Sequence, residues 1–193
     1  MELDVVGRLL GAVKGKRLLE LGCGDGDAAI RFTQEGATVI GVDASADRIA
    51  DARAAADAAE VRLELRAGDL ADLAFLRADS IDAVVSMHTL AEVDDIARVF
   101  RQVERVLKPG AAFVFSYEHP IGLWTGPDGT LAHSPFDRGP IAVDGRTVFV
   151  RTTSEVFTEL HRAGLRADTL LEPRQSATWV PQSVIWRVRA EGA

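Results

Sequence analysis

The segment from Leu18 to Asp27 constrains the fold of this chain more than any other. An apolar run that contains Glu20 ends there, and glycines then stand at alternate positions before a helical pattern begins. Glycine permits backbone torsions that other residues avoid, and it lets a ligand approach the main chain closely. The acid at the end of the strand then lies at the rim of a pocket. This order of strand, glycine turn and helix predicts a parallel sheet that holds a nucleotide-like cofactor at one edge.

Three kinds of cofactor loop can be compared with this segment. A phosphate-binding P-loop needs Lys and then Ser or Thr after its last glycine, whereas Asp27 and Ala28 follow Gly26. A dinucleotide fingerprint needs its third glycine three places after the second, and that place holds Asp27. Glu20, Asp25 and Asp27 would also repel a pyrophosphate at the start of the helix. A cofactor with a cationic sulfonium and an ammonium group suits the negative turn, so S-adenosylmethionine is preferred.

The size and charge of the chain limit the classes of protein that it can represent. Its 193 residues correspond to one domain, expected to span 1–193. The net charge of −7 argues against nucleic acid as a partner, because backbone binding needs clustered Lys and Arg. No apolar run reaches the length of a membrane span, and no secretory signal is visible at the start. The single cysteine cannot form an internal disulfide, so a cytoplasmic location without a membrane partner is expected.

Strand-like and helix-like segments alternate along the chain. Strands are expected at 16–21, 37–42, 61–66, 81–87, 111–117, 165–171 and 183–189, and helices at 3–13, 27–34, 46–59, 96–107 and 153–163. Pro109 and Gly110 are expected to end the fourth helix. Such alternation predicts an α/β fold with a parallel, doubly wound sheet that helices cover on both faces. The Gly- and Pro-rich stretch 118–150 is expected to form a long loop.

Five segments resemble, in order along the chain, the motifs of one enzyme family. They are Glu20–Gly26, Gly41–Ser45, Gly68–Leu70, Asp82–Ser86 and Arg105–Ser116. Together they resemble the class I S-adenosylmethionine-dependent methyltransferases, and the last segment resembles the type 11 branch of that family. The resemblance covers the region from the first expected strand to the fifth. It implies a mostly parallel, Rossmann-like sheet of seven strands whose last strand is antiparallel, a direction that the periodicity of the chain does not establish.

The family motifs imply contacts with separate parts of the cofactor. The resemblance assigns Glu20 to the amino group of S-adenosylmethionine. It assigns Asp43 to the ribose, where one carboxylate can accept both hydroxyls. Asp69 is implied to accept a hydrogen bond from the adenine amino group, while the backbone of Leu70 contacts the neighbouring ring nitrogen. The other residues expected at the floor and walls of this pocket are Gly22, Cys23, Gly24, Gly26, Ala44, Ser86 and Met87.

Candidate catalytic residues follow the fourth and fifth expected strands. His88 is the first polar side chain beyond the fourth strand, where an acceptor would approach, and histidine acts as a base near neutral pH. A loop histidine without a catalytic role is an equally good interpretation. Tyr117, Glu118 and His119 leave the fifth strand at the same edge and are further candidates to orient the acceptor or remove a proton. The thiol of Cys23 has no nearby base and is interpreted as a small filler.

The function expected from these features is methyl transfer from S-adenosylmethionine to oxygen, nitrogen or carbon of a small or medium organic acceptor, with S-adenosylhomocysteine as product. A non-catalytic S-adenosylmethionine-binding or regulatory protein is the main alternative, and a nicotinamide-dependent reductase is the third. No metal is expected, because the histidines lack metal-ligand spacing. The stretch 118–150 is the candidate for acceptor recognition or a lid. Because about fifteen residues precede the first strand, the site is expected to be open, or closed by the second subunit of a homodimer.

Overall fold

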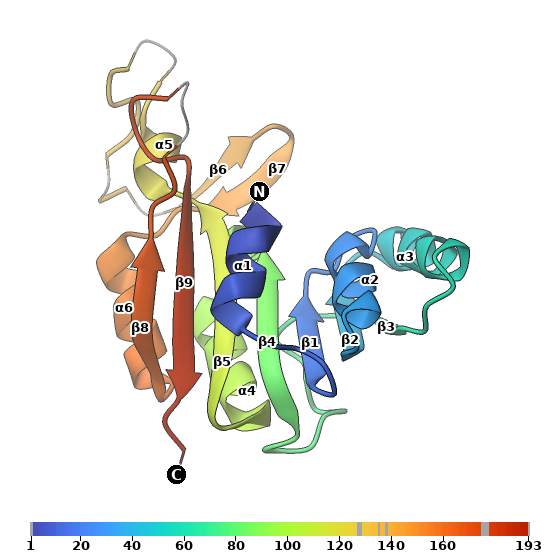
Figure 1. The fold of residues 1–193 in the computed structure, drawn as a ribbon. Helices are drawn as coiled ribbons and strands as arrows, with labels where there is room; N and C mark the ends of the chain where they lie inside the picture. The colour runs from blue at the N-terminus through green and yellow to red at the C-terminus, as the bar shows by residue number, and fades with distance from the viewer. Residues whose placement is uncertain (1, 127–128, 135, 138, 175–177, 193) are drawn as a thin grey trace.

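The computed structural model describes residues 2–126, 129–134, 136–137, 139–174 and 178–192. Its central feature is a seven-stranded sheet in the order β3-β2-β1-β4-β5-β9-β8 (Figure 1). The strands of this sheet are β1 (Arg17–Leu21), β2 (Thr38–Asp43), β3 (Glu64–Ala67), β4 (Ile81–Met87), β5 (Leu107–Glu118), β8 (Leu165–Leu171) and β9 (Ser183–Ala190). Strands β1 to β5 pair in parallel, and β9 is antiparallel to both β5 and β8. The expected mostly parallel sheet with an antiparallel last strand is therefore confirmed.

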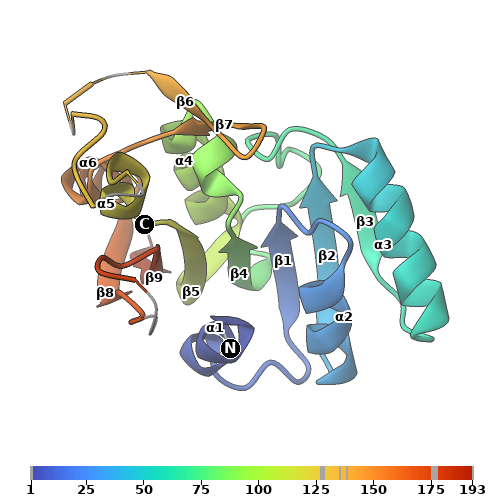
Figure 2. The same ribbon diagram turned by 90° about the horizontal axis from the view of Figure 1, so that it is seen from above.

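Helices cover both faces of this sheet, as Figure 2 shows from above. The helices are α1 (Glu2–Leu10), α2 (Asp27–Gln34), α3 (Ala46–Ala58), the 3₁₀ turn η1 (Leu90–Glu92), α4 (Ile96–Val106), α5 (Pro120–Trp124) and α6 (Thr153–Arg162). Helices α1 and α2 pack on one face, and α4 and α6 pack on the other. None of the described helices is long and apolar enough to cross a membrane.

The two faces form separate apolar clusters because successive side chains of a strand point to opposite sides. In β1, Leu18 packs with α1 and α2, whereas Leu19 packs with the cluster beneath α4 and α6. Phe32 on α2 and Phe100 on α4 are fully buried, one in each cluster. Each such side chain contributes about 1.5–3 kcal/mol to stability through its removal from water. The sheet is thus a rigid platform for the turns at its edges.

The order of the strands reverses between β1 and β4. From β1 the chain adds β2 and then β3 on one side, and it returns to add β4 and β5 on the other. The connections that leave β1 and β4 at their carboxyl ends therefore diverge and open a crevice there. In open α/β sheets, ligands bind at such a switch point. The fold itself locates the candidate site at the carboxyl ends of β1, β2 and β4.

Local signals in the sequence account for several helix ends. The Ser45 side chain accepts a hydrogen bond from the backbone of Arg48 and caps α3, while Asp95 caps α4 in the same way. Thr152 and Glu155 form a capping box at the start of α6. Such caps satisfy backbone N–H groups that have no partner inside the helix, and each is worth about 0.5–2 kcal/mol.

Three expected boundaries differ from the structure. Helix α1 ends at Leu10 rather than at residue 13, because Gly11 adopts a left-handed φ of 71°. Strand β3 starts only at Glu64 and is shorter than expected. Helix α4 ends at Val106, and Pro109 and Gly110 lie inside β5 rather than at the end of the helix. A shift in register between β4 and β5 accommodates them there, because proline has no N–H to donate to the ladder.

The stretch 118–150 contains more regular structure than expected. It includes the short helix α5 and a hairpin of β6 (Pro140–Val143) and β7 (Arg146–Phe149). Asp144 and Gly145 form the turn with φ values of 48° and 77°. An Asp-Gly pair is the usual sequence of a tight hairpin turn, because both residues tolerate positive φ. The hairpin lies above the carboxyl ends of β4 and β5 (Figures 1 and 2).

The first and last elements of the chain reach opposite ends of the sheet: α1 begins at one end, and β9 finishes at the other (Figure 1). Helix α1 begins near the carboxyl ends of β4 and β5 and runs along the sheet towards the start of β1. The ion pair between Arg31 on α2 and Asp4 on α1, at 2.8 Å, ties the first turn to the neighbouring helix. The first residues of the chain are therefore held beside the switch point.

Candidate functional site

A cavity of about 780 Å³ lies at the carboxyl ends of β1, β2 and β4. Its walls are the glycine turn after β1 and the segments that follow β2, β3 and β4. Of the residues expected to bind the cofactor, those that line it are Gly22, Gly24, Asp43, Ala44, Asp69, Leu70 and Met87. The expected residues outside its lining are Glu20, Cys23, Gly26 and Ser86. The structure thus brings motifs from four separate strands to one crevice.

The three glycines of the turn have different tasks. All three have positive φ, at 74°, 54° and 90° for Gly22, Gly24 and Gly26. A side chain on Gly22 would overlap that of Thr89, which follows β4. At Gly24 the nearest atom to an added Cβ is in Arg48, 4.0 Å away, so the backbone is open to the cavity. At Gly26 the same carbon would lie 3.1 Å from Ala52 Cβ, so this glycine lets α2 and α3 pack closely.

Asp43 joins the end of β2 to the glycine turn. Its Oδ2 accepts a hydrogen bond from Gly24 N at 2.9 Å, and its Oδ1 accepts one from Ser45 N at 2.9 Å. The residue is buried, yet it lines the cavity. An ionised carboxylate has about four acceptor positions, so two remain for a ligand. Asp43 is therefore both a clamp on the turn and an acceptor directed at the cavity.

Asp69 and Leu70 form the wall after β3. The Asp69 side chain accepts a hydrogen bond from Ala71 N at 2.8 Å and lies 3.6 Å from the Arg98 guanidinium. More than half of this side chain is exposed, whereas Leu70 is buried. An exposed acceptor beside an apolar surface suits the edge and face of a purine base.

Glu20 lies beneath the glycine turn. Burial raises the pKa of this carboxyl to about 8, and the charges of Asp25, Asp27 and Asp43 add to the effect. A hydrogen bond from the backbone of Ala29 opposes the shift. Its Oε2 has no hydrogen-bond partner among the residues that the structure describes. Glu20 is thus a buried acid that is protonated near neutral pH and that a nearby cation would ionise.

Cys23 and Ser86 face the interior of the protein. The Cys23 side chain occupies the space that a side chain at Gly41 would fill, and it packs against β2. Burial and the neighbouring charges of Glu20 and Asp43 raise the pKa of this thiol to about 12. A thiol that stays protonated is a poor nucleophile. Ser86 is fully buried, and within the described part of the chain its hydroxyl lacks a hydrogen-bond partner.

His88 is the one residue of the four catalytic candidates that lines the cavity. It follows β4 directly and has a left-handed φ of 54°, while its backbone N donates to Ser116 O at 2.9 Å. Its Nε2 lies 2.9 Å from Glu2 Oε1 of α1. The contact with Glu2 raises the pKa of His88, although burial opposes the shift.

The other three candidates do not line the cavity. Tyr117 is buried and stacks on Phe115, and burial raises its pKa to about 12. Glu118 Oε1 accepts a hydrogen bond from Arg146 at 2.8 Å. His119 caps α5 through Nδ1 and lies 2.9 Å from Glu172 through Nε2. Adjacent positions in a strand point to opposite faces, so one edge does not bring all three side chains to one place.

Arg146 is a cavity residue that sequence reasoning missed. It lies on β7, and its guanidinium contacts Glu92 Oε1 at 3.0 Å and Glu118 Oε1 at 2.8 Å. These contacts join the hairpin to η1 and to the end of β5. The Asp144–Gly145 turn was the signal that could have placed Arg146, because it indicates a hairpin.

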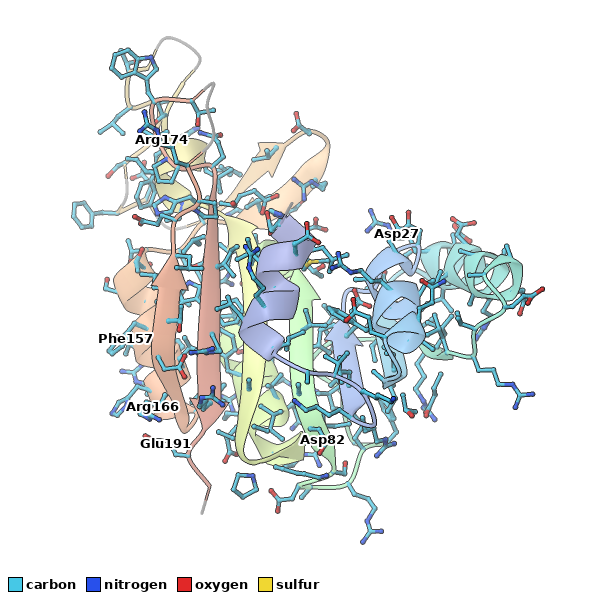
Figure 3. All side chains as sticks on the ribbon, in the orientation of Figure 1. Asp27, Asp82, Phe157, Arg166, Arg174 and Glu191 are labelled. Carbon is cyan, nitrogen blue, oxygen red and sulfur yellow. The ribbon has the colours of Figure 1, made fainter. Side chains whose placement is uncertain are left out.

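The cavity wall carries more negative than positive charge. Of the described residues that line it, the acids are Asp43, Asp69, Glu92, Asp94 and Asp95, and the arginines are Arg48, Arg98 and Arg146. Figure 3 shows Asp27 at the same edge of the sheet, whereas Asp82 lies at the opposite edge. These features suit a cationic adenosyl ligand. The wall is acidic, the backbone is open at Gly24, and Oε2 of the buried Glu20 has no hydrogen-bond partner among the described residues. Among the described residues, no group of acids, histidines and cysteine is arranged to hold a metal ion.

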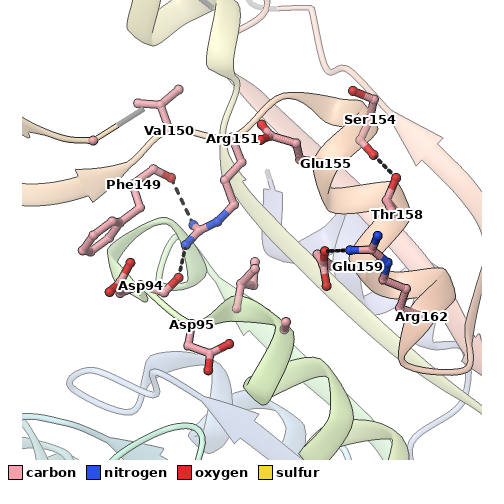
Figure 4. Close-up of a pocket in the computed structure, with 13 residues that line it drawn as sticks. Asp94, Asp95, Phe149, Val150, Arg151, Ser154, Glu155, Thr158, Glu159 and Arg162 are labelled. Atoms are coloured by element: carbon pink, nitrogen blue, oxygen red, sulfur yellow. Dashed lines mark hydrogen bonds and ion pairs between the residues drawn. The ribbon is translucent and has the colours of Figure 1, made fainter. Parts of the chain in front are cut away.

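A second cavity, of about 590 Å³, lies between the start of α4 and helix α6 (Figure 4). Arg151 enters it and donates hydrogen bonds to the backbone oxygens of Phe149 and Asp94 at 3.1 and 2.6 Å. Arg162 pairs with Glu159 at 2.7 Å on its far side. These charged groups are occupied by internal contacts, and Gly139 is the one glycine among the described residues that line the cavity. It is therefore a less suitable place for a nucleotide-like cofactor.

A doubly wound sheet with an antiparallel seventh strand, and a glycine-floored acidic cavity at its switch point, define the class I methyltransferase fold. The family model described as "Methyltransferase domain" matches residues 19–115. The chain belongs to this family, which accounts for its glycine turn and for the four strands that surround the cavity.

Known proteins of this family agree with the fold. The "Ubiquinone biosynthesis O-methyltransferase" of Alkalilimnicola ehrlichii is 34% identical over 116 residues, which are 60% of this chain and 47% of that protein. An S-adenosylmethionine-dependent methyltransferase from Mesorhizobium loti superposes with a TM-score of 0.84 at 28% identity, over 96% of both chains. A crystal structure from Listeria monocytogenes, described as an S-adenosylmethionine-dependent methyltransferase, shares the fold with a TM-score of 0.80 at 22% identity, over 99% of this chain and 98% of that chain. The chain spans about half the length of the curated relatives that it matches.

Proposed function

We propose that this protein transfers a methyl group from S-adenosylmethionine to a small or medium organic acceptor, with S-adenosylhomocysteine as the product. The observation that carries the proposal is the glycine-floored, acidic cavity at the switch point of the sheet. An oxygen acceptor is favoured over nitrogen or carbon, because the curated relatives include proteins named as O-methyltransferases.

Different residues of the site bind different parts of the cofactor. The carboxylate of Asp43 accepts the ribose hydroxyls, and the open backbone at Gly24 permits close approach. Asp69 and Leu70 hold the adenine, while Glu20 attracts the ammonium group directly or through water. When bound, S-adenosylmethionine supplies a methyl group on a positively charged sulfur. The main task of the protein is to align the acceptor with that carbon, and such positioning can lower a barrier by about 7–11 kcal/mol.

Calorimetry with S-adenosylmethionine, S-adenosylhomocysteine and NAD tests the cofactor assignment. Binding of the two adenosyl compounds without binding of NAD is expected, and tight NAD binding alone would overturn the proposal. Asp43→Asn should weaken binding of S-adenosylhomocysteine by about 1–3 kcal/mol, because hydrogen bonds to a charged acceptor are lost. Asp51→Asn is the matched control, since Asp51 is an exposed acid on α3 that does not line the cavity.

The alternative function is binding or regulation without catalysis. It is favoured by the positions of Tyr117, Glu118 and His119, which do not line the cavity. Release of S-adenosylhomocysteine from S-adenosylmethionine in the presence of phenols, amines and carboxylic acids separates the two functions. Turnover with any of these acceptors supports the enzyme, and binding without turnover supports the regulatory protein.

Two further expectations stay predictions. We infer a cytoplasmic location from the single cysteine and the negative charge of the chain. A homodimer in which a second copy covers the cavity is tested by sedimentation with and without S-adenosylhomocysteine. A monomer under both conditions would contradict it.

A further inference from the structure

His88 is held in an unusual conformation at the wall of the cavity. Its φ of 54° lies in the left-handed region that few residues other than glycine adopt. The hydrogen bond from its backbone N to Ser116 O fixes this turn against β5. Less than half of the side chain is exposed, and the residue lines the cavity. A side chain that is held in this way, where an acceptor would lie, suggests a task that depends on its orientation.

The partner of His88 is a carboxylate from the other end of the sequence. Glu2 Oε1 of α1 lies 2.9 Å from His88 Nε2. Burial of Glu2 opposes its ionisation, but contacts with His88 and Ser116 outweigh this and lower the pKa of the carboxyl. Helix α1 is held in place by the ion pair between Asp4 and Arg31 and by the fully buried side chain of Val6. Glu2 therefore contacts His88 as part of an anchored helix.

Two other charged groups act on the imidazole. Glu118, at the end of β5, raises the pKa of His88, and Arg146, on β7, lowers it. These two residues pair with each other at 2.8 Å, so their effects on His88 largely oppose one another. Glu2 has the largest effect of the three. Removal of Glu2 alone should therefore change the protonation of His88.

We propose that Glu2 is a positioning residue whose carboxylate, 2.9 Å from His88 Nε2, holds the imidazole at the wall of the cavity so that His88 serves as the general base for a hydroxyl acceptor. The proposal rests on the proposed function and narrows its substrate class to phenols or other hydroxyl compounds that must lose a proton. A carboxylate beside one ring nitrogen orients an imidazole and stabilises the imidazolium that forms when the ring takes up a proton.

In the proposed step the acceptor loses a proton and gains a methyl group. The O–H bond of the acceptor breaks, and its proton moves to the imidazole of His88 as the oxygen forms a bond to the methyl carbon. The carbon–sulfur bond breaks, and its electron pair stays on the sulfur of neutral S-adenosylhomocysteine. The carboxylate of Glu2 stabilises the imidazolium until the proton passes to water. General-base assistance of this kind contributes about 10²–10⁴-fold to a rate.

The first test does not need the natural acceptor. The ring nitrogens of His88 can be titrated by NMR in protein labelled with ¹⁵N-histidine, with and without S-adenosylhomocysteine. The chain has four histidines, and the spectrum of His88→Gln assigns the signal. In Glu2→Gln the pKa of His88 should fall, because the carboxylate that lies 2.9 Å from Nε2 is removed.

Asp51→Asn is the control for this titration. It removes an exposed carboxylate of α3 that lies outside the lining of the cavity and makes no part of the α1 anchor. The pKa of His88 should not change in this variant. An identical pKa of His88 in Glu2→Gln and in the native protein would overturn the proposal. If Glu2→Gln does not fold, as judged by circular dichroism, Glu2→Asp serves in its place, with a smaller change expected in the same direction.

The second test compares two probe acceptors, catechol and thiophenol. A thiophenol ionises near neutral pH without help, whereas a catechol hydroxyl does not. Glu2→Gln should slow methylation of catechol at least about tenfold, move the acidic limb of its pH profile to lower pH, and leave methylation of thiophenol unchanged. An equal loss with both acceptors, or no loss with either, contradicts the assigned role of Glu2. Failure of the native protein to bind S-adenosylmethionine or to methylate any acceptor counts instead against the proposed function, and the NMR titration still decides the pairing.

Discussion

The two sides of the cavity are built in different ways. On one side, the glycine turn and Asp43 are close in sequence and are joined by a backbone hydrogen bond from Gly24. On the other side, Glu2 and Arg146 reach the neighbourhood of His88 from distant parts of the chain. The first side depends on backbone conformation, and the second depends on ion pairs between distant elements. The cofactor side is formed by the glycine turn and Asp43, and the acceptor side by His88, Glu2 and Arg146. This difference suggests that the cofactor side tolerates little change in sequence, whereas the acceptor side can vary without loss of the fold.

Gly22→Ala is expected to have the largest effect. A new Cβ would overlap the side chain of Thr89, and the residue has a φ of 74°. Overpacking costs about 1–3 kcal/mol, and the left-handed conformation costs about 1–2 kcal/mol. Binding of S-adenosylhomocysteine, measured by calorimetry, should fall at least about tenfold, and thermal stability should fall with it.

Two variants separate these effects at Gly22. Gly15→Ala also has positive φ, at 76°, but an added Cβ there meets no atom within 4 Å. It should lower stability slightly and leave binding unchanged. Addition of Thr89→Ala to Gly22→Ala should restore part of the lost affinity. Native affinity in Gly22→Ala would show that the glycine turn is less constrained than the structure indicates.

Glu20 should make the stability of the free protein depend on pH. Its pKa is raised to about 8 in the folded state from 4.5 in the unfolded chain. The folded state therefore binds more protons than the unfolded state between these values, and stability should fall as pH rises from 4.5 towards 8. The loss is about 2–5 kcal/mol. Urea unfolding of native protein and Glu20→Gln at several pH values measures it, and the variant should lack this part of the slope.

The same carboxyl should release a proton when the cofactor binds. An ammonium group near Glu20 favours its ionised form, so binding of S-adenosylhomocysteine near pH 7 should release up to about one proton. Affinity should then increase between about pH 6 and pH 8. Calorimetry in phosphate and in Tris measures the proton from the difference in apparent enthalpy. If native protein and Glu20→Gln release the same number of protons, Glu20 does not contact the ammonium group.

Arg146→Ala should have the smallest effect of these variants. The guanidinium is about one third exposed, and its pairs with Glu92 and Glu118 are worth about 0–1 kcal/mol each. The melting temperature should therefore change little, and affinity for S-adenosylhomocysteine should stay the same. The KM for catechol should increase, because the hairpin loses its contact with η1 and β5. A large loss of cofactor affinity would contradict the division between the two sides.

The sequence predicted the cofactor side better than the acceptor side. The glycine spacing and the acid after β2 are local patterns, and local backbone conformation determines where those residues lie. The positions of His88, Tyr117, Glu118 and His119 were inferred from nearness to strand ends. Only His88 lines the cavity, because alternation along β5 and capping of α5 turn the other three away.

The contacts that complete the acceptor side were not predictable from spacing. Glu2 lies 86 positions before His88 in the chain, and helix packing alone brings them together. Arg146 depends on a hairpin whose Asp144–Gly145 signal lay inside a stretch that was interpreted as a loop. Contacts between distant elements depend on the angle at which whole elements pack, and one sequence carries little direct information about that angle.

The start of α1 has a practical consequence for handling the protein. Glu2, the first described residue of α1, lies beside His88, whereas β9 ends at the opposite end of the sheet (Figure 1). A purification tag at the amino end would thus compete with the acceptor for space and alter the surroundings of the imidazole. Kinetic work on this protein should use a carboxyl-terminal tag or one that is cleaved completely.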